Sequence, residues 1–197
     1  MKEIILATYN HNKKRELSNL LGSNIKLITL DEINFNENIV EDGKSFIENA
    51  LKKCESVYNI TKKPVIADDS GLCVETLDGG PGIFSARYGG QELNDTERYQ
   101  YLLSQIKDIK NLNASFVCAL VLYVNKNKIY IIQEEVKGQI TFDPKGNNGF
   151  GYDPIFYIPE LKKTMAELSE KEKDQISHRG KAAKIMKNII DKLDFSM

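Results

Sequence analysis

The stretch Val65-Ile66-Ala67-Asp68-Asp69-Ser70-Gly71 leads from an apolar, β-prone run into two adjacent carboxylates and then small turn-forming residues. It predicts a buried strand with charge at its end. An unpaired ionised carboxylate is costly to bury, so Asp68 and Asp69 need solvent, a basic partner or a metal ion. Ligands of open α/β sheets lie beyond the carboxyl ends of strands, which makes this corner a candidate binding site. An ordinary solvated turn is the alternative, because Asp, Ser and Gly are common in turns.

On either side of this stretch, apolar spacing predicts an alternation of strands and helices. Before it, strands are expected at residues 4–7 and 26–30, and helices at 13–21 and 46–57. After it, the pattern predicts a helix at 94–106, a hairpin of strands 115–124 and 129–140, and a closing helix at 183–193. This order favours one α/β domain over residues 1–197, with mixed or parallel strand pairing.

Composition and charge exclude several classes of protein. The chain has 197 residues, 41% of them hydrophobic, and a formal net charge of −1, which argues against binding to polymeric nucleic acid. Its longest apolar run, residues 116–124, is shorter than the roughly 20 residues of a membrane-spanning helix. We therefore expect a soluble globular protein that binds no membrane and no nucleic-acid polymer.

The cysteines and histidines indicate a compartment and a type of metal. The three cysteines Cys54, Cys73 and Cys118 form no C-x-x-C pair, which favours a reducing, cytoplasmic location. Only two histidines are present, His11 and His178, too few for a multi-histidine metal site. A metal, if used, is expected to be an oxygen-liganded ion such as Mg²⁺.

The segment between the first strand and the first helix is a candidate phosphate site. It places backbone N–H groups, hydroxyl and amide side chains and one ammonium at a helix N-terminus, in Thr8, Tyr9, Asn10, His11, Asn12 and Lys13. The glycines of a Walker loop are absent. Capping of the helix by Asn or Thr is the alternative interpretation.

A second acidic segment precedes the helix expected at residues 46–57. Glu41 would face Asp68 and Asp69 if that helix packs beside their strand, and carboxylates gathered around one spot repel unless a divalent ion joins them. Lys53, farther along the helix, is a candidate phosphate ligand. A lysine with its stem on the surface and its ammonium in water is the alternative.

Residues 142–154 combine glycines with aromatic rings, a composition that suits a loop on which a flat base stacks. A surface loop fastened to the core by its aromatic residues is the alternative. Lys173 precedes Ser177-His178-Arg179 by one helical turn, so donors converge where the last helix is expected to begin. His178 and Arg179 are candidate ligands of a base carbonyl or a phosphate.

Together these segments resemble the inosine triphosphate pyrophosphatase, or HAM1-like, family. Six blocks match its pattern in order: Thr8-x-Asn10-x-x-Lys13, Glu41 to Ala50, Ala67 to Leu72, Pro81 to Tyr88, Gly149 to Pro154, and Ser177-His178-Arg179. The resemblance implies an elongated two-lobed α/β fold around a long mixed sheet, with the active site in a cleft between the lobes. It also implies a homodimer.

The resemblance further implies hydrolysis of purine nucleoside triphosphates with deaminated bases (ITP, dITP, XTP) to the monophosphate and pyrophosphate. Asp69 would be the general base and a metal ligand, and Glu41 and Asp68 would help to hold Mg²⁺. The substrate would contact the loop Thr8, Tyr9, Asn10, His11, Asn12 and Lys13, together with Lys53 and Ser70, through its phosphates. Its base would contact Phe150, Gly151, Tyr152, Asp153, Lys173, His178 and Arg179.

Two other interpretations stay open at the level of sequence. A Maf-like pyrophosphatase, which acts on pyrimidine or modified nucleotides, has a similar overall fold, but the Ser177-His178-Arg179 and Phe150 to Pro154 segments argue against it. A nucleotide-sensing module that binds a triphosphate without cleaving it would need the whole set of residues except Asp69. Turnover of the nucleotide distinguishes an enzyme from such a sensing module.

Overall fold

The computed structural model describes residues 1–107 and 110–195. The chain divides into two compact units. Unit 1 comprises Met1–Asp69, Cys118–Glu134 and Arg179–Met197, and unit 2 comprises Ser70–Val117 and Glu135–His178. The strands are hydrogen-bonded in the order β2-β1-β3-β4-β5-β6-β7, with both parallel and antiparallel pairs, so the expected α/β fold with a mixed sheet is confirmed.

The main helices and strands follow the alternation predicted from apolar spacing. In chain order they are β1 (Lys2–Leu6), α1 (His11–Leu21), β2 (Ile25–Thr29), α2 (Phe46–Thr61), β3 (Val65–Val74), α3 (Asp95–Ile106), β4 (Asn113–Asn125), β5 (Lys128–Ile140), β6 (Phe156–Ile158), β7 (Lys163–Thr164), α4 (Glu170–Ile176) and α5 (His178–Lys192). The short elements β6, β7 and α4 lack a clear apolar period and were not anticipated.

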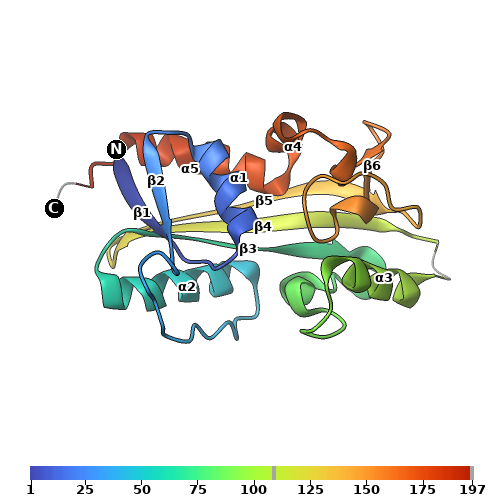
Figure 1. Cartoon of the computed structure of the whole chain (residues 1–197), viewed down its shortest axis with the longest axis horizontal. Coiled ribbons are helices and arrows are strands. Elements are labelled where there is room, and N and C mark those ends of the chain that lie inside the picture. Colours follow the sequence, from blue (N-terminus) through green and yellow to red (C-terminus); the bar gives the residue numbers. More distant parts are fainter. Residues whose placement is uncertain (108–109, 196–197) are drawn as a thin grey trace. The chain divides into compact units, whose positions relative to one another are not determined.

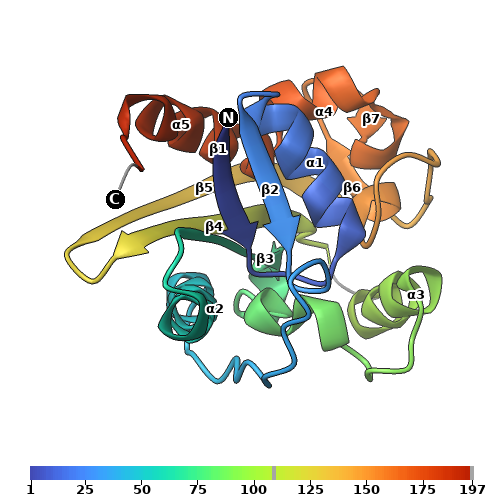
Figure 2. The same cartoon turned by 60° about the vertical axis from the view of Figure 1, so that its left-hand side comes forward.

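In unit 1, β1 lies between β2 and β3 and pairs in parallel with both, so that Leu6 is opposite Thr29 on one side and Ile66 on the other. Helices α1 and α5 cover one face of these strands, and α2 covers the opposite face (Figures 1 and 2). The core under α1 and α5 includes Leu17, Leu120 and Met186, all buried. Each strand therefore presents alternate residues to different helices.

Strand β3 differs from the prediction in one respect that matters for the site. It does not end at the two aspartates: it continues to Val74, so Asp68 and Asp69 lie inside a buried strand and not in a turn. The predicted end of the strand at this point is therefore wrong, and so is the alternative of a solvated turn. The carboxylates are tolerated there because each has a cationic partner, as described below.

In unit 2, β5, β6 and β7 form antiparallel pairs, with Gln139 opposite Tyr157. The core of the unit includes Phe116 and Phe156, whose ring centroids are 4.4 Å apart. Helix α3 starts with a capping box between Asn94 and Glu97. Among the described residues of the chain, we find no helix whose length and apolar character would let it cross a membrane.

Candidate functional site

The segment between β1 and α1 is organised by helix capping. The Oδ1 of Asn10 accepts hydrogen bonds from the backbone N–H groups of Asn12 (2.9 Å) and Lys13 (3.1 Å), and the Oγ1 of Thr8 accepts one from Asn10 (3.1 Å). The capping interpretation of Asn10 is thus confirmed. Tyr9 and His11 are exposed, and the Tyr9 hydroxyl donates to the carbonyl oxygen of Phe35.

The two adjacent aspartates of β3 point to opposite faces of the sheet, as successive residues of a strand must. Asp68 faces α1 and α5, where its partners are Lys13 and Arg179. Asp69 faces α2, where its partners are Lys53 and Asn49. This corrects the expectation that Asp68, Asp69 and Glu41 gather around one cation.

Asp68 is the centre of a buried ionic network. Its Oδ1 lies 2.6 Å from Lys13 Nζ, and its Oδ2 lies 2.8 Å from Arg179 Nε. The Cys118 thiol is also within hydrogen-bonding distance of Oδ2, at 3.2 Å. Burial alone raises the pKa of Asp68, but the charges of Arg179 and Lys13 outweigh it and hold that pKa well below its usual range. Two cations, Lys13 and Arg179, thus compensate the charge of this one carboxylate, so we do not place Asp68 at a metal.

Arg179, which the sequence put among the base contacts, belongs to the same ionic network in this structure. Its Nη1 lies 2.6 Å from the Oε2 of Glu16, and its side chain is buried between that carboxylate and Asp68. Glu16 was missed from the sequence. The only available signal was its position three residues after Lys13 on α1, which puts both side chains on one helix face.

On the other face of β3, one ammonium joins two carboxylates. Lys53 Nζ lies 2.8 Å from Asp69 Oδ1 and 2.9 Å from Glu41 Oε2. The Lys53 side chain is only 9% exposed, so the interpretation as a surface lysine is wrong. Burial lowers the pKa of Lys53, but the charges of Asp69 and Glu41 prevail and raise it overall. For Asp69 the balance is reversed: burial outweighs the charge of Lys53, and its pKa is raised.

Asn49 links this carboxylate pair to the acidic loop before α2. Its Nδ2 donates to Asp69 Oδ2 at 3.3 Å, and its Oδ1 accepts from the Gly43 N–H at 2.8 Å. A side chain at Gly43 would clash, since a Cβ there would lie 2.6 Å from that Oδ1. Glycine is therefore required for the loop that carries Glu41 to approach α2. Asn49 was not among the residues to which a role was assigned from the sequence.

Glu41 and Asp69 are the candidate residues for a magnesium ion. Their oxygens converge on one positive charge, that of Lys53, and carboxylate oxygen is the ligand type that Mg²⁺ prefers. The part of the chain that the structure describes holds no group of three or more His, Cys, Asp or Glu placed to bind a metal. Two carboxylates suffice where substrate phosphates and water supply the other ligands, the usual arrangement for Mg²⁺.

Unit 2 holds a second group of the predicted residues. Lys173 Nζ lies 2.7 Å from Asp153 Oδ2 and 5.2 Å from the centre of the Phe150 ring, and the same Asp153 oxygen accepts from the Phe150 N–H at 2.9 Å. In the same unit, the His178 ring stacks on the Phe116 ring with a centroid distance of 4.9 Å. The combination of a half-buried ring, a carboxylate and cationic donors suits a purine.

Two further predicted residues of this loop have structural partners. Tyr152 is 5% exposed, packs in the core of unit 2, and donates its hydroxyl to the carbonyl oxygen of Ser85. Gly151 donates its N–H to Asp95 at 2.7 Å. Ser70 is half-buried in β3, directly after Asp69.

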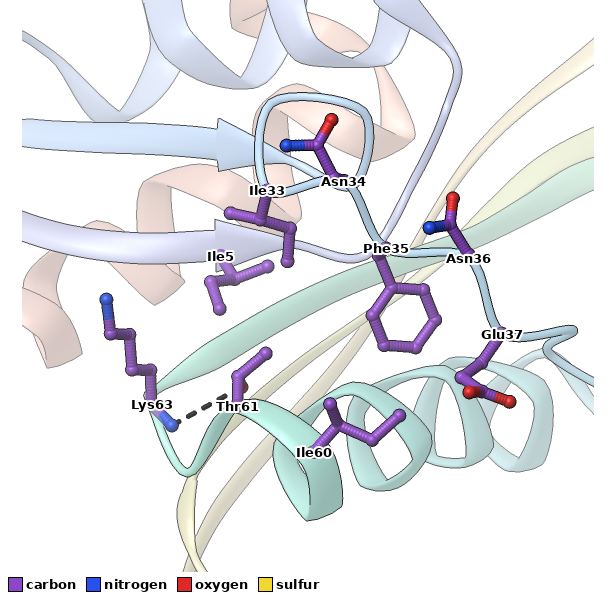
Figure 3. A pocket seen from close by; sticks show the side chains of 9 residues that line it. All are labelled: Ile5, Ile33, Asn34, Phe35, Asn36, Glu37, Ile60, Thr61 and Lys63. Carbon is purple, nitrogen blue, oxygen red and sulfur yellow. Dashed lines mark hydrogen bonds between the residues drawn. The ribbon is translucent and has the colours of Figure 1, made fainter.

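A cavity of about 430 Å³ in unit 1 contains none of the predicted residues. Figure 3 shows it between the loop after β2, which carries Asn34, Phe35 and Glu37, and the end of α2 at Ile60. Its walls combine apolar side chains with scattered amide and charged groups, without a convergent set of catalytic side chains.

Comparison with known proteins gives a consistent result. The model of the Ham1 family matches residues 4–189. A dITP/XTP pyrophosphatase of Treponema denticola is 46% identical over 184 residues, which cover 91% of this chain and 94% of that protein. The dITP/XTP pyrophosphatase of Bacillus subtilis is 42% identical over 196 residues, covering 97% of this chain and 98% of that protein.

Solved structures of two Ham1 proteins are similar to this chain in fold. A HAM1 protein from Coxiella burnetii superposes with a TM-score of 0.89 at 40% identity, covering 98% of this chain and 100% of that one. The Ham1 protein of Staphylococcus aureus gives a TM-score of 0.87 at 38% identity, with 96% and 98% covered.

Proposed function

The chain belongs to the Ham1 family, and from this premise we propose that it hydrolyses deaminated purine nucleoside triphosphates, namely ITP, dITP and XTP, to the monophosphate and pyrophosphate. The observation that carries the proposal is the Asp69 carboxylate, whose pKa is raised by burial while it shares Lys53 with Glu41. A carboxylate of raised basicity beside a fixed cation is the arrangement that activation of water next to a phosphate chain requires.

In the proposed reaction Asp69 accepts a proton from the attacking water. The water oxygen bonds to the α-phosphorus, the bond from that phosphorus to the oxygen bridging the α- and β-phosphates breaks, and pyrophosphate leaves. Lys13 and Lys53 offset the charge that develops on the leaving group. Mg²⁺, which Glu41 and Asp69 would hold, would supply charge neutralisation and would acidify the bound water.

The phosphates are proposed to lie against the start of α1, with Thr8, Asn10 and Lys13 as their contacts, as the resemblance implies. Because the Oδ1 of Asn10 already accepts from two backbone N–H groups of α1, its Nδ2 is the group that would donate to a phosphate. For the base we propose Phe150, Asp153 and Lys173 of unit 2, with His178. Hypoxanthine and xanthine carry a carbonyl acceptor at position 6 where adenine has an amino donor, so a lysine or histidine donor favours the deaminated bases.

The test is a product assay with the full chain. ITP, dITP, XTP, GTP, ATP and a pyrimidine triphosphate are incubated with Mg²⁺, and nucleotides, pyrophosphate and orthophosphate are separated by ion chromatography. We expect monophosphate and pyrophosphate in equal amounts, fastest from the deaminated purines. Release of orthophosphate alone, or preference for the pyrimidine, would overturn the proposal.

Tight binding of ITP without turnover would identify a nucleotide sensor instead. Asp69→Asn is the reference for that outcome, because it removes the proposed base and leaves the other nucleotide contacts in place.

We also propose a cytoplasmic location and a homodimer. The location is supported by three cysteines that are all free thiols, two of them buried in unit 1. The dimer rests on the family resemblance alone, and light scattering coupled to size-exclusion chromatography would measure it.

A further inference from the structure

One matching block of the sequence, Pro81 to Tyr88, has no part in the proposed chemistry. Building on the proposed function, we propose that residues 85–95 act as a brace that holds the base-binding loop, Gly149–Asp153, and that Asp95 is its positioning residue. Asp95 touches neither phosphate nor metal in the proposed reaction. Its effect on the substrate would pass through the backbone of Gly151.

Three successive residues of the base-binding loop are each fastened by a different acceptor. The Phe150 N–H donates to Asp153 Oδ2 at 2.9 Å, within the loop itself. The Gly151 N–H donates to Asp95 Oδ2 at 2.7 Å, and the Tyr152 hydroxyl donates to the carbonyl oxygen of Ser85 at 2.9 Å. Two of the three anchors thus come from the brace, more than 50 residues earlier in the chain.

The brace is itself held firmly. Arg98 is 6% exposed, and its guanidinium donates to the carbonyl oxygens of Tyr88 and Gly90, each at 2.8 Å, and of Leu93. At the other end, Ser85 Oγ accepts from the Leu72 N–H at 2.9 Å. A buried arginine that satisfies three carbonyls fixes the segment leading into α3, so Asp95 is oriented before any ligand binds.

The hydrogen bond from Gly151 to Asp95 fixes the backbone directly beside the Phe150 ring. Gly151 adopts a φ of +64°, in the left-handed region, and its neighbour Phe150 carries the ring that lies beside Lys173. Without the Asp95 carboxylate, the Gly151 N–H loses a charge-assisted hydrogen bond, and the ring loses part of its positioning. Base binding is expected to suffer, whereas the chemistry at Asp69 is expected to persist.

The experiment compares Asp95→Ala with Asp95→Asn, which keeps an oxygen acceptor, and with Glu92→Ala, which removes one negative charge from the same exposed segment. Each full-length protein is measured in three ways. Hydrogen exchange by mass spectrometry follows a peptide covering residues 149–153. Steady-state kinetics give KM and kcat for ITP. Inhibition by tripolyphosphate reports binding of a phosphate chain that has no base.

For Asp95→Ala we expect exchange in the loop peptide to be about tenfold faster. KM for ITP is expected to rise about fivefold to tenfold, with kcat within about twofold of the starting protein. The inhibition constant of tripolyphosphate is expected to stay within about twofold, and Asp95→Asn to recover most of the loss in KM.

The inference fails if Asp95→Ala matches Glu92→Ala in loop exchange and in KM, or if kcat and tripolyphosphate binding fall together with ITP binding. Failure of the proposed function has a different signature, namely no pyrophosphate from ITP with the unmodified protein. The exchange measurement is independent of turnover, so it tests the brace in either case.

Discussion

Asp68 and Asp69 are neighbours in β3, yet their carboxylates lie on opposite faces of the sheet and serve different charges: Arg179 and Lys13 on one face, Lys53 on the other. The pKa of Asp68 is strongly lowered and that of Asp69 is raised. Two identical side chains, one peptide bond apart, therefore separate into a structural anchor that its cationic partners keep ionised and a candidate base. Replacement by asparagine is therefore expected to affect turnover at position 69 and stability at position 68.

Asp69→Asn is expected to lower kcat for ITP by at least about 10²-fold, because the amide cannot accept the proton of water. Binding of ITP, measured by calorimetry with Mg²⁺, should persist. Asp42→Asn is a matched control, since Asp42 is an exposed acid of the loop before α2 that pairs with Lys52 of that helix. Nearly normal turnover of the Asp69 variant would move the role of base to another residue.

Asp68→Asn is expected to act on stability. It leaves the buried guanidinium of Arg179 with Glu16 as its remaining acidic partner, and breaking a buried ion pair from one side costs about 3–5 kcal/mol. Urea unfolding followed by circular dichroism measures the loss. Glu3→Gln, which removes an exposed ion pair with Lys26, should change the midpoint little. Equal shifts in the two variants would show that the buried network contributes no more than a surface pair.

The same network predicts a dependence of stability on pH. The pKa of Asp68 is lower in the folded than in the unfolded chain, so its stabilisation is complete above the unfolded value of about 3.9 and is lost as pH falls from there toward the folded value. The free energy of unfolding of the unmodified protein should therefore fall steeply below about pH 4. Asp68→Asn should show a shallower loss over that range, and identical slopes would contradict the ionic role of Asp68.

Lys53→Met is expected to tighten the binding of free metal while impairing turnover. The ammonium of Lys53 occupies the point on which the Glu41 and Asp69 oxygens converge, and its removal leaves two carboxylates without a counter-charge. With Mn²⁺ as a spectroscopic probe and no nucleotide present, we expect affinity to rise about tenfold or more. Lys52→Met, one residue away and paired with the exposed Asp42, is the control. Unchanged or weaker Mn²⁺ binding in the Lys53 variant would remove Glu41 and Asp69 as the metal ligands.

Gly149→Ala is expected to weaken base binding selectively. Gly149 has a φ of +78°, and a Cβ there would lie 2.0 Å from Asp153 Oδ2, which must then leave Lys173 and the Phe150 N–H. Gly79→Ala controls for the backbone cost, because Gly79 has a similar φ of +83° and a Cβ there would meet no atom within 4 Å. KM for ITP should rise far more in the Gly149 variant, with inhibition by tripolyphosphate unchanged in both. A parallel loss of tripolyphosphate binding would mean that the substitution disturbs more than the base contacts.

The succession of strands and helices could be predicted from the sequence, because the period of apolar residues is a local property. Strands such as β4 and β5, and helices such as α2, follow from side chains that must leave water within a few residues of one another. Glu41, Lys53 and Asp69 could also be named as candidate site residues from the sequence, because short segments of it match the pattern of a known family.

How β3 accommodates two charges could not be predicted from the sequence and depends on long-range packing. The polar pair interrupts the apolar run and reads locally as the end of a strand, but Arg179, 111 residues later in the chain, neutralises Asp68 inside the sheet. The partner of a buried charge is fixed by folding and not by neighbours in sequence, so no local pattern reveals it. For the same reason Glu16, Asn49 and Asp95 acquired their roles only when elements distant in the chain were packed together.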